Sequence, residues 1–265
     1  MKIFEIIDYE NEMSVGVLIY YDKKKDFIIE LKDDLDEWTA PLLFTGLIKK
    51  RIYTVLRKLS RMWVEERVIP YDRQNIGDIL KNHKLEAYDE MKFLELSEGR
   101  CSQDHLYIKK INEFPDYVLE RQKKTITECV CCEKKRLICF FADDTIKLTD
   151  LEKIPDVPGV DKVLKMDSLY ESCLVGTGGY FITFNDSIDI PAWLLYEKGE
   201  KVPLSKNDFL GFARNNILDT SGCCRLLECS RQNVAYLAKR KYLKPVKEDV
   251  KGNLYFKGDV IKNCW

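Results

Sequence analysis

Short apolar runs separated by polar turns fill the first part of the chain. Residues 14–31 contain two apolar runs joined by a polar Asp-Lys-Lys-Lys-Asp turn, which predicts a β-hairpin. Residues 33–69 have helical character, with Pro41 either at a helix start or at a break. Residues 85–108 are rich in acids and indicate helix or a mixture of helix and strand. We therefore expect an uncharacterised α+β domain over residues 1–122.

Strand and turn signals continue through the middle of the chain. Residues 125–151 predict three strands joined by polar turns. Residues 176–199 predict strand, turn, strand and a terminal helical turn, with a short helix before them. Together they indicate a second, smaller α+β domain over residues 123–204.

Helical spacing dominates the last part, residues 205–265. Ser205 is a plausible N-cap for a linker helix. A short helix is expected over 221–227 and, after a two-residue turn, a second helix over 230–241 capped by Ser230.

The second of these helices has two distinct faces. Setting Val234 inward places Leu237 and Ala238 on the same face, three and four residues further on. Side chains able to bond base edges or phosphates occupy the opposite face: Gln232, Asn233, Tyr236, Lys239 and Arg240.

A basic hairpin is expected after the second helix. Strands over 243–246 and 253–256 would form a wing spanning 243–256, and Asp259 could cap a last turn. The predicted fold class is thus α+β multidomain: two α+β domains followed by a small winged helix-turn-helix. The DNA-binding residues expected from it are Ser230, Arg231, Gln232, Asn233, Tyr236, Lys239, Arg240, Lys241, Lys247 and Lys251.

The charge distribution supports this interpretation. The chain has a net charge of -1, but from Arg225 onward ten Lys and Arg face four acids, a local charge of +6 that leaves -7 on the remainder. A basic terminal module on an acidic body is typical of a tethered nucleic-acid-binding domain. The alternatives are a solvated Lys-rich surface and a helical hairpin that only packs.

The stretch "CSRQNVAYLAKRKYLKPVKEDVKGNLYFKGDV" resembles the MerR/excisionase-type winged helix-turn-helix. The resemblance covers residues 219–262 and implies bacterial DNA binding through the second helix and the wing. It places that role on Ser230, Arg231, Gln232, Tyr236, Lys239, Arg240 and Lys251. MerR-type regulators usually carry the motif first and dimerise through a following coiled coil. Here the motif comes last, so a homodimer would have to form through the N-terminal or middle domain.

Two further resemblances carry no known chemistry. Residues 123–200, with "CFFADDTIKLTDL" and "GTGGYFITFNDSIDIPAWLLY", resemble a small bacterial α+β domain of unknown function, although Asp144 replaces its customary glycine. Members of that family occur alone, fused to helix-turn-helix domains or beside toxin-like partners, which implies a regulatory or protein-binding role. Residues 1–120 are similar to uncharacterised proteins of anaerobic Firmicutes.

The segment "DRQNIGDILKNHKL" (72–85) echoes the start of the terminal helix. Ile76, Ile79 and Leu80 are expected to form its buried face behind an Asp72 cap. Its exposed face has no net positive charge and acids follow it, so phosphates would not bind there. We expect an ordinary capped helix and a single DNA-reading helix.

Ten cysteines in a long chain indicate reduced thiols in a cytosol. Cys129 and Cys131 should share one side of a strand and Cys132 the other. Their spacing is too tight for a common zinc knuckle, so buried thiols are expected, with a metal or redox role as the alternative. "GTGGY" lacks the third glycine of a dinucleotide fingerprint. We therefore expect no metal, no cofactor and no catalytic residue.

The expected function is a cytoplasmic bacterial transcriptional regulator that binds double-stranded DNA and has no membrane segment. One alternative is an antitoxin-like or scaffold module with a degenerate helix-turn-helix and a protein partner. The other is an enzyme within residues 1–120, which a pocket of titratable groups with perturbed pKa values would support. In that domain a site would be sought near Arg100, Gln103, Asp104 and His105.

Overall fold

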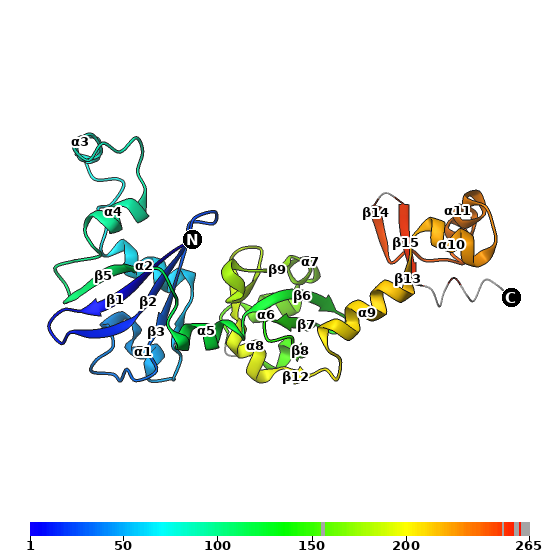
Figure 1. The fold of residues 1–265 in the computed structure, drawn as a ribbon, viewed down its shortest axis with the longest axis horizontal. Coiled ribbons are helices and arrows are strands. Elements are labelled where there is room, and N and C mark those ends of the chain that lie inside the picture. Colours follow the sequence, from blue (N-terminus) through cyan, green and yellow to red (C-terminus); the bar gives the residue numbers. More distant parts are fainter. Residues whose placement is uncertain (155–156, 251, 257–259, 261–265) are drawn as a thin grey trace. The chain divides into compact units, whose positions relative to one another are not determined.

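The fold comes from a computed structural model that describes residues 1–154, 157–250, 252–256 and 260 (Figure 1). The chain divides into two compact units. Unit 1 comprises Met1–Asp143 and Lys147–Lys201, and unit 2 comprises Asp144–Ile146 and Val202–Trp265. Ten pairs of described strands are antiparallel, and helices lie between the strands along the chain, which confirms the α+β class.

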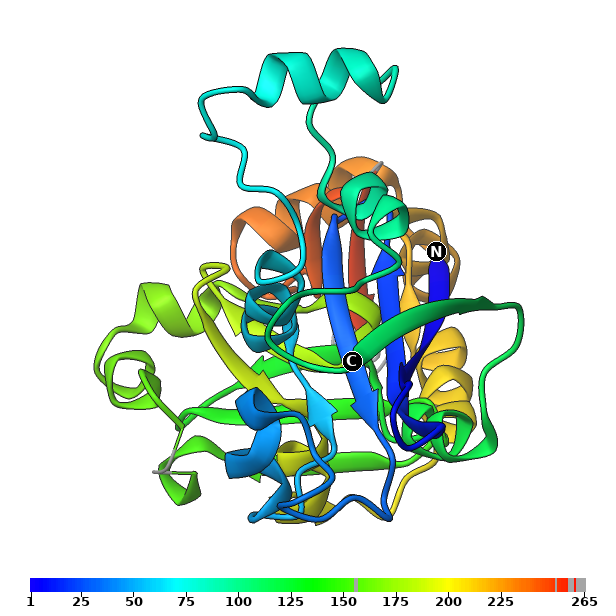
Figure 2. The same ribbon diagram turned by 90° about the vertical axis from the view of Figure 1, so that its left-hand side faces the viewer.

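The first half of unit 1 is built on a five-stranded sheet of order β4-β3-β2-β1-β5 (Figure 2). The expected hairpin is confirmed, because β2 pairs with β3 around the polar turn. The strands are β1 (Lys2–Asp8), β2 (Met13–Tyr21), β3 (Asp26–Leu31), β4 (Thr54–Val55) and β5 (Leu106–Ile111). The helices are η1 (Leu42–Phe44), α1 (Thr45–Ile48), α2 (Arg57–Glu65), α3 (Ile76–Asn82) and α4 (Glu90–Leu96).

The second half of unit 1 contains two small sheets, of order β11-β10-β9 and β12-β8-β7-β6. The strand, turn and helix order expected for residues 125–151 and 176–199 is confirmed. The strands are β6 (Ile126–Cys132), β7 (Arg136–Phe141), β8 (Ile146–Asp150), β9 (Cys173–Val175), β10 (Phe181–Phe184), β11 (Ile188–Pro191) and β12 (Glu200–Lys201). The helices are α5 (Asp116–Gln122), η2 (Leu151–Lys153), α6 (Val160–Lys165), α7 (Asp167–Glu171), η3 (Thr177–Gly179) and α8 (Ala192–Lys198).

Alternating side chains bury both faces of the five-stranded sheet. On β2, Leu18 and Tyr20 pack into a core with α2 and α4, whereas Val17 and Ile19 pack into another with Phe181 of β10. The predicted boundary between residues 122 and 123 therefore falls inside one compact unit. The two parts of unit 1 on either side of that boundary also share an ion pair, between Arg57 and Asp189.

That ion pair is bidentate and partly buried. The Arg57 guanidinium of α2 donates to both carboxylate oxygens of Asp189 on β11, at 2.9 and 2.8 Å. The Asp189 side chain is only 7% exposed. Bidentate Arg–carboxylate pairs fix geometry as well as charge, so this contact orients α2 against the second half of the unit.

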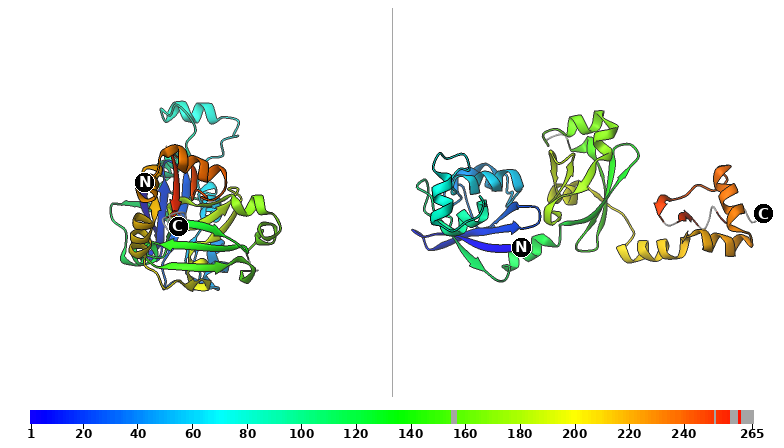
Figure 3. Two further views of the ribbon diagram at one scale, coloured as in Figure 1. Left: turned by 90° about the vertical axis from the view of Figure 1, so that its right-hand side faces the viewer. Right: turned by 90° about the horizontal axis from the view of Figure 1, so that it is seen from above.

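Unit 2 has its own core of buried side chains. Its helices and strands are drawn in Figure 3. Its helices are α9 (Lys206–Asn216), α10 (Thr220–Leu227) and α11 (Arg231–Lys239), and its strands are β13 (Ile217–Leu218), β14 (Lys247–Val250) and β15 (Gly252–Phe256), in the order β13-β15-β14. The linker helix begins as expected, because Ser205 and Asp208 form a reciprocal capping box.

Two local expectations were wrong. The first strand of the C-terminal hairpin covers Lys247–Val250 and not 243–246, since Pro245 has no backbone N–H to donate to a ladder. The echo helix α3 begins at Ile76, and its N-cap, Asn75, makes no side-chain capping bond. None of the α3 residues is buried, so the expected apolar face is only partly covered.

Candidate functional sites

The α10–α11 hairpin is defined by three local features. Asp219 caps α10 by accepting from the Gly222 N–H at 2.6 Å. Glu228 ends the helix in the left-handed region at φ 51°, a common way to close a helix. Ser230 then caps α11 by accepting from the Asn233 N–H at 3.3 Å. The start and direction of α11 therefore follow from the sequence.

The inward face of α11 is the one expected. Val234 is fully buried in the core of unit 2, and Leu237 and Ala238 pack partly against it. Cys223 is buried in the same core, with Cys224 and Cys229 packed against it. Because these contacts fix the rotation of the helix about its axis, they also determine which side chains lie on the opposite face.

The opposite face of α11 is polar, basic and exposed. Tyr236 is 52% exposed, and the Arg240 guanidinium lies 5.5 Å from the centre of its ring. The Arg231 guanidinium donates to the Ser221 hydroxyl of α10 at 3.2 Å, so part of its donor capacity is used inside the unit. The expected residues that are exposed are Ser230, Arg231, Gln232, Asn233, Tyr236, Lys239, Arg240, Lys241 and Lys247.

The structure brings these expected residues together on one helix and the following hairpin. Within the described part of the chain, no carboxylate forms an ion pair with Lys239, Arg240 or Lys241. Lys247 begins β14, and Gly252 opens β15 at φ +97°, a conformation that favours glycine. Lys251 and Asp259 lie outside the described residues.

Arg100, Gln103, Asp104 and His105, singled out in the first half of unit 1, lie outside the walls of the pocket described below. Asp104 pairs with the buried Arg67, whose guanidinium lies 3.7 Å from the Trp63 ring centre. The Arg100 guanidinium lies over the Tyr107 ring at 4.8 Å. His105 Nδ1 is 3.0 Å from the Tyr9 hydroxyl. These contacts hold the loop before β5.

Three cysteines of β6 and β7, namely Cys129, Cys131 and Cys139, face the core of the second half of unit 1. The sulfur of Cys129 lies 3.7 Å from that of Cys139 and 3.8 Å from that of Cys173. As expected, Cys129 and Cys131 belong to this core and Cys132 does not. Burial raises the pKa of Cys131 to about 12, which keeps the thiol protonated near neutral pH. The described residues include no His, Cys, Asp and Glu group arranged to hold a metal ion.

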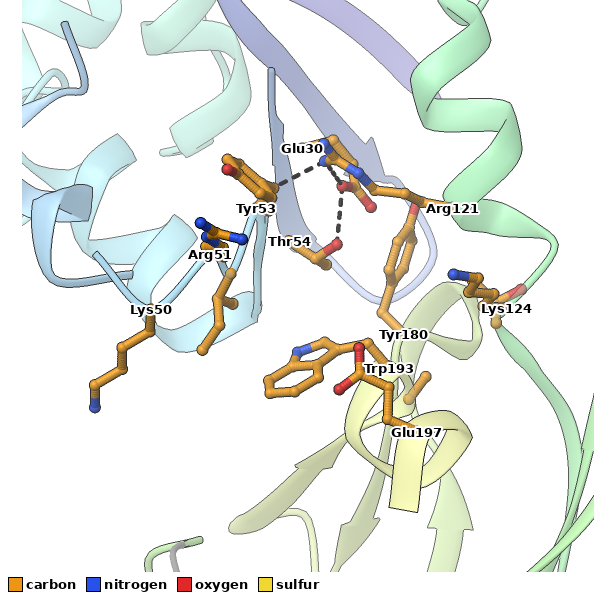
Figure 4. A pocket seen from close by; sticks show the side chains of 13 residues that line it. Glu30, Lys50, Arg51, Tyr53, Thr54, Arg121, Lys124, Tyr180, Trp193 and Glu197 are labelled. Carbon is orange, nitrogen blue, oxygen red and sulfur yellow. Dashed lines mark hydrogen bonds and ion pairs between the residues drawn. The ribbon is translucent and has the colours of Figure 1, made fainter. Parts of the chain in front are cut away.

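A pocket of about 400 Å³ in unit 1 was not anticipated from the sequence (Figure 4). Glu30 of β3 lies in its wall with no exposed surface, and burial raises the pKa of its carboxyl to about 7 against the opposing effect of Arg121. Such a group is what the enzyme hypothesis required, although Arg121 and Thr54 already bind one of its oxygens. The sequence signal for this pocket was an acid, Glu30, at an inward-facing position of a strand. The residues that complete the pocket are far from Glu30 in the sequence.

Searches against protein-family models, curated proteins and solved structures found no match to this chain. Within the described residues, none of the helices combines the length and the apolar character needed to cross a bilayer.

Proposed function

We propose that this chain is a DNA-binding protein that acts in transcriptional regulation, with residues 205–265 as a linker helix followed by a winged helix-turn-helix. The observation that carries the proposal is the exposed basic face of α11, whose rotation is fixed by the buried Val234. The β14–β15 hairpin beside it supplies a further exposed cation, Lys247. The sequence resemblance to the MerR/excisionase type supports the same assignment.

In the proposed complex, α11 enters the major groove. Gln232 and Asn233 carry amides that can bond adenine bidentately, and Tyr236 lies one turn further along the same face. Lys239 and Arg240, at the end of the helix, would bind phosphates and set the register of the protein on the duplex. Lys247 would extend that phosphate contact through the hairpin.

A single short helix reads too few base pairs for useful specificity, so the proposed regulator binds as a homodimer. The site of action we propose is the cytosol. The nine cysteines that the structure describes are all free thiols, which is consistent with the reducing environment of the cytosol.

The test is fluorescence anisotropy of the full chain with random-sequence duplex DNA at rising salt. Each protein–phosphate contact contributes about 0.9 to the slope of log K against log salt. The variant Lys239→Glu/Arg240→Glu should therefore weaken binding and flatten the slope by about 2. The control Lys162→Glu/Lys165→Glu changes the same charge on the exposed face of α6 and should leave both quantities unchanged.

Two results would contradict the proposal. One is a folded wild-type protein that does not bind duplex DNA at low salt. The other is equal loss of DNA binding in the two double variants. That result would show that DNA binding depends on the net charge of the protein and not on the face of α11. Either result would favour the alternative in which the chain binds a protein. The next experiment would then be a search for that protein partner.

A further inference from the structure

The pocket of unit 1 is enclosed by segments far apart in the sequence. Its walls come from β3 and β4, the turn after α1, the end of α5, Tyr180 before β10, and α8. In Figure 4, Glu30 and Arg121 lie on one side and the Trp193 indole on the opposite side. A volume of about 400 Å³ is within the range of small-molecule sites, roughly 300–1,000 Å³.

Two polar atoms in its lining residues are buried and have no hydrogen-bond partner among the described residues: Glu30 Oε1 and Trp193 Nε1. The other oxygen of Glu30 accepts from Thr54 at 2.9 Å and from Arg121 at 2.6 Å, so the carboxyl is held in place while Oε1 stays unused. Buried polar atoms in folded proteins nearly always have partners. Trp193 Nε1 is thus an unused donor, and Glu30 Oε1 is an unused acceptor when the carboxyl is ionised and a donor when it is protonated.

The charged side chains of the lining favour an anion. Four cations face two acids, and the six are Lys50, Arg51, Arg121, Lys124, Glu30 and Glu197. Lys50, Arg51 and Lys124 are exposed, and no carboxylate forms an ion pair with any of them in the part of the chain that the structure describes. Cations at the mouth of a partly enclosed cavity raise the local concentration of anionic ligands.

Aromatic rings line the same cavity. Tyr53, Tyr180 and Trp193 contribute to its wall, and the Arg121 guanidinium lies 5.3 Å from the centre of the Tyr53 ring. Aromatic rings and guanidinium planes are the surfaces on which bases stack. A ligand that matches every feature therefore has a planar ring with a donor and an acceptor, and carries a negative charge.

We propose that this pocket binds a mononucleotide, with the base against Trp193 and the phosphate towards Lys50 and Arg51. The Trp193 N–H and the free Glu30 oxygen would bond the polar edge of the base. Ligand binding here is separate from the proposed DNA contact, since no lining residue belongs to α10, α11 or the β14–β15 hairpin.

The test is isothermal titration of the full chain with the adenosine, guanosine, cytidine and uridine monophosphates, with inorganic phosphate and the free nucleosides in parallel. At least one mononucleotide should bind more tightly than phosphate and than its own nucleoside. Lys50→Glu should weaken that binding roughly tenfold through charge reversal. The control Lys165→Glu should not change it. Trp193→Phe keeps a ring but removes the donor and should weaken binding roughly fivefold.

Failure of all four mononucleotides to bind at millimolar concentration would overturn the proposal. So would phosphate binding as tightly as the nucleotides, or equal affinities in Lys50→Glu and Lys165→Glu. Lys239→Glu/Arg240→Glu separates this site from the DNA interface, because it should retain nucleotide binding. Loss of nucleotide binding in that variant would assign the ligand to unit 2 and refute the pocket. Unfolding curves would verify that each variant is folded.

Discussion

Glu30 makes the stability of unit 1 depend on pH in a direction opposite to that of a typical salt-bridged acid. Its carboxyl is fully buried on β3, where the loss of hydration disfavours the charged form more than Arg121 favours it. The pKa rises from 4.5 to about 7 in the folded protein. The folded state therefore keeps a proton that the unfolded state has already released.

The sign of the effect follows from this difference in bound protons. The stabilisation from a raised pKa is fully present below pH 4.5 and is lost as the pH rises towards 7, because over that range the unfolded state binds fewer protons. The shift corresponds to about 3 kcal/mol of unfolding free energy. Glu30→Gln has no such titration and keeps a similar size, and Arg121 keeps its pairing with Asp33.

The assay is urea unfolding of the wild type and Glu30→Gln from pH 4.5 to 8, followed by tryptophan fluorescence, to which the buried Trp63 contributes. The unfolding free energy of the variant minus that of the wild type should rise with pH by up to about 3 kcal/mol and level off near pH 8, above the folded-state pKa of about 7. Taking the difference cancels the titration of other groups. The exposed Glu171→Gln serves as control and should give a constant difference.

A constant difference for Glu30→Gln across this range would refute the reasoning. A difference that falls with pH would show that the ion pair with Arg121 outweighs the cost of burial, and that the pKa of Glu30 is lowered.

Two further predictions concern unit 2 and its candidate DNA-binding face. Ser230→Ala removes the cap of α11 and should destabilise unit 2 by about 1 kcal/mol, measured by thermal unfolding, with DNA affinity falling alongside. Equal stability would show that water replaces the cap. Val234→Ala removes two methyl groups from a fully buried position and should cost roughly 2 kcal/mol. A loss under 0.5 kcal/mol would show that the core of unit 2 is loosely packed, which would undermine the fixed rotation of α11.

Elements governed by local signals could be predicted from the sequence. The β2–β3 hairpin, the strands β6 and β7, and the caps at Ser205 and Ser230 all depend on residues within a few positions of each other. The inward face of α11 was predictable for the same reason, since Val234 is an apolar residue at helical spacing with Leu237 and Ala238.

Features that depend on distant partners were not predictable. Pro245 has no N–H for a ladder, which disfavours a strand over 243–246, but the apolar residues around it favoured one in the sequence. The α3 segment has the right periodicity for burial, yet none of its residues is buried in the structure. The pocket at Glu30 needs Arg121 and Trp193, which lie 91 and 163 positions away and show no pairing signal in a single sequence.

The two buried faces of the five-stranded sheet have a consequence for how this protein can be divided. A fragment ending at residue 122 would leave Val17, Ile19 and Ile28 without their Tyr180 and Phe181 neighbours and expose a β-branched apolar surface to water. Such a surface promotes self-association, so the N-terminal half is expected to precipitate or aggregate when expressed alone. Residues 1–201 instead keep that surface covered, and the two halves of unit 1 should lose their structure together.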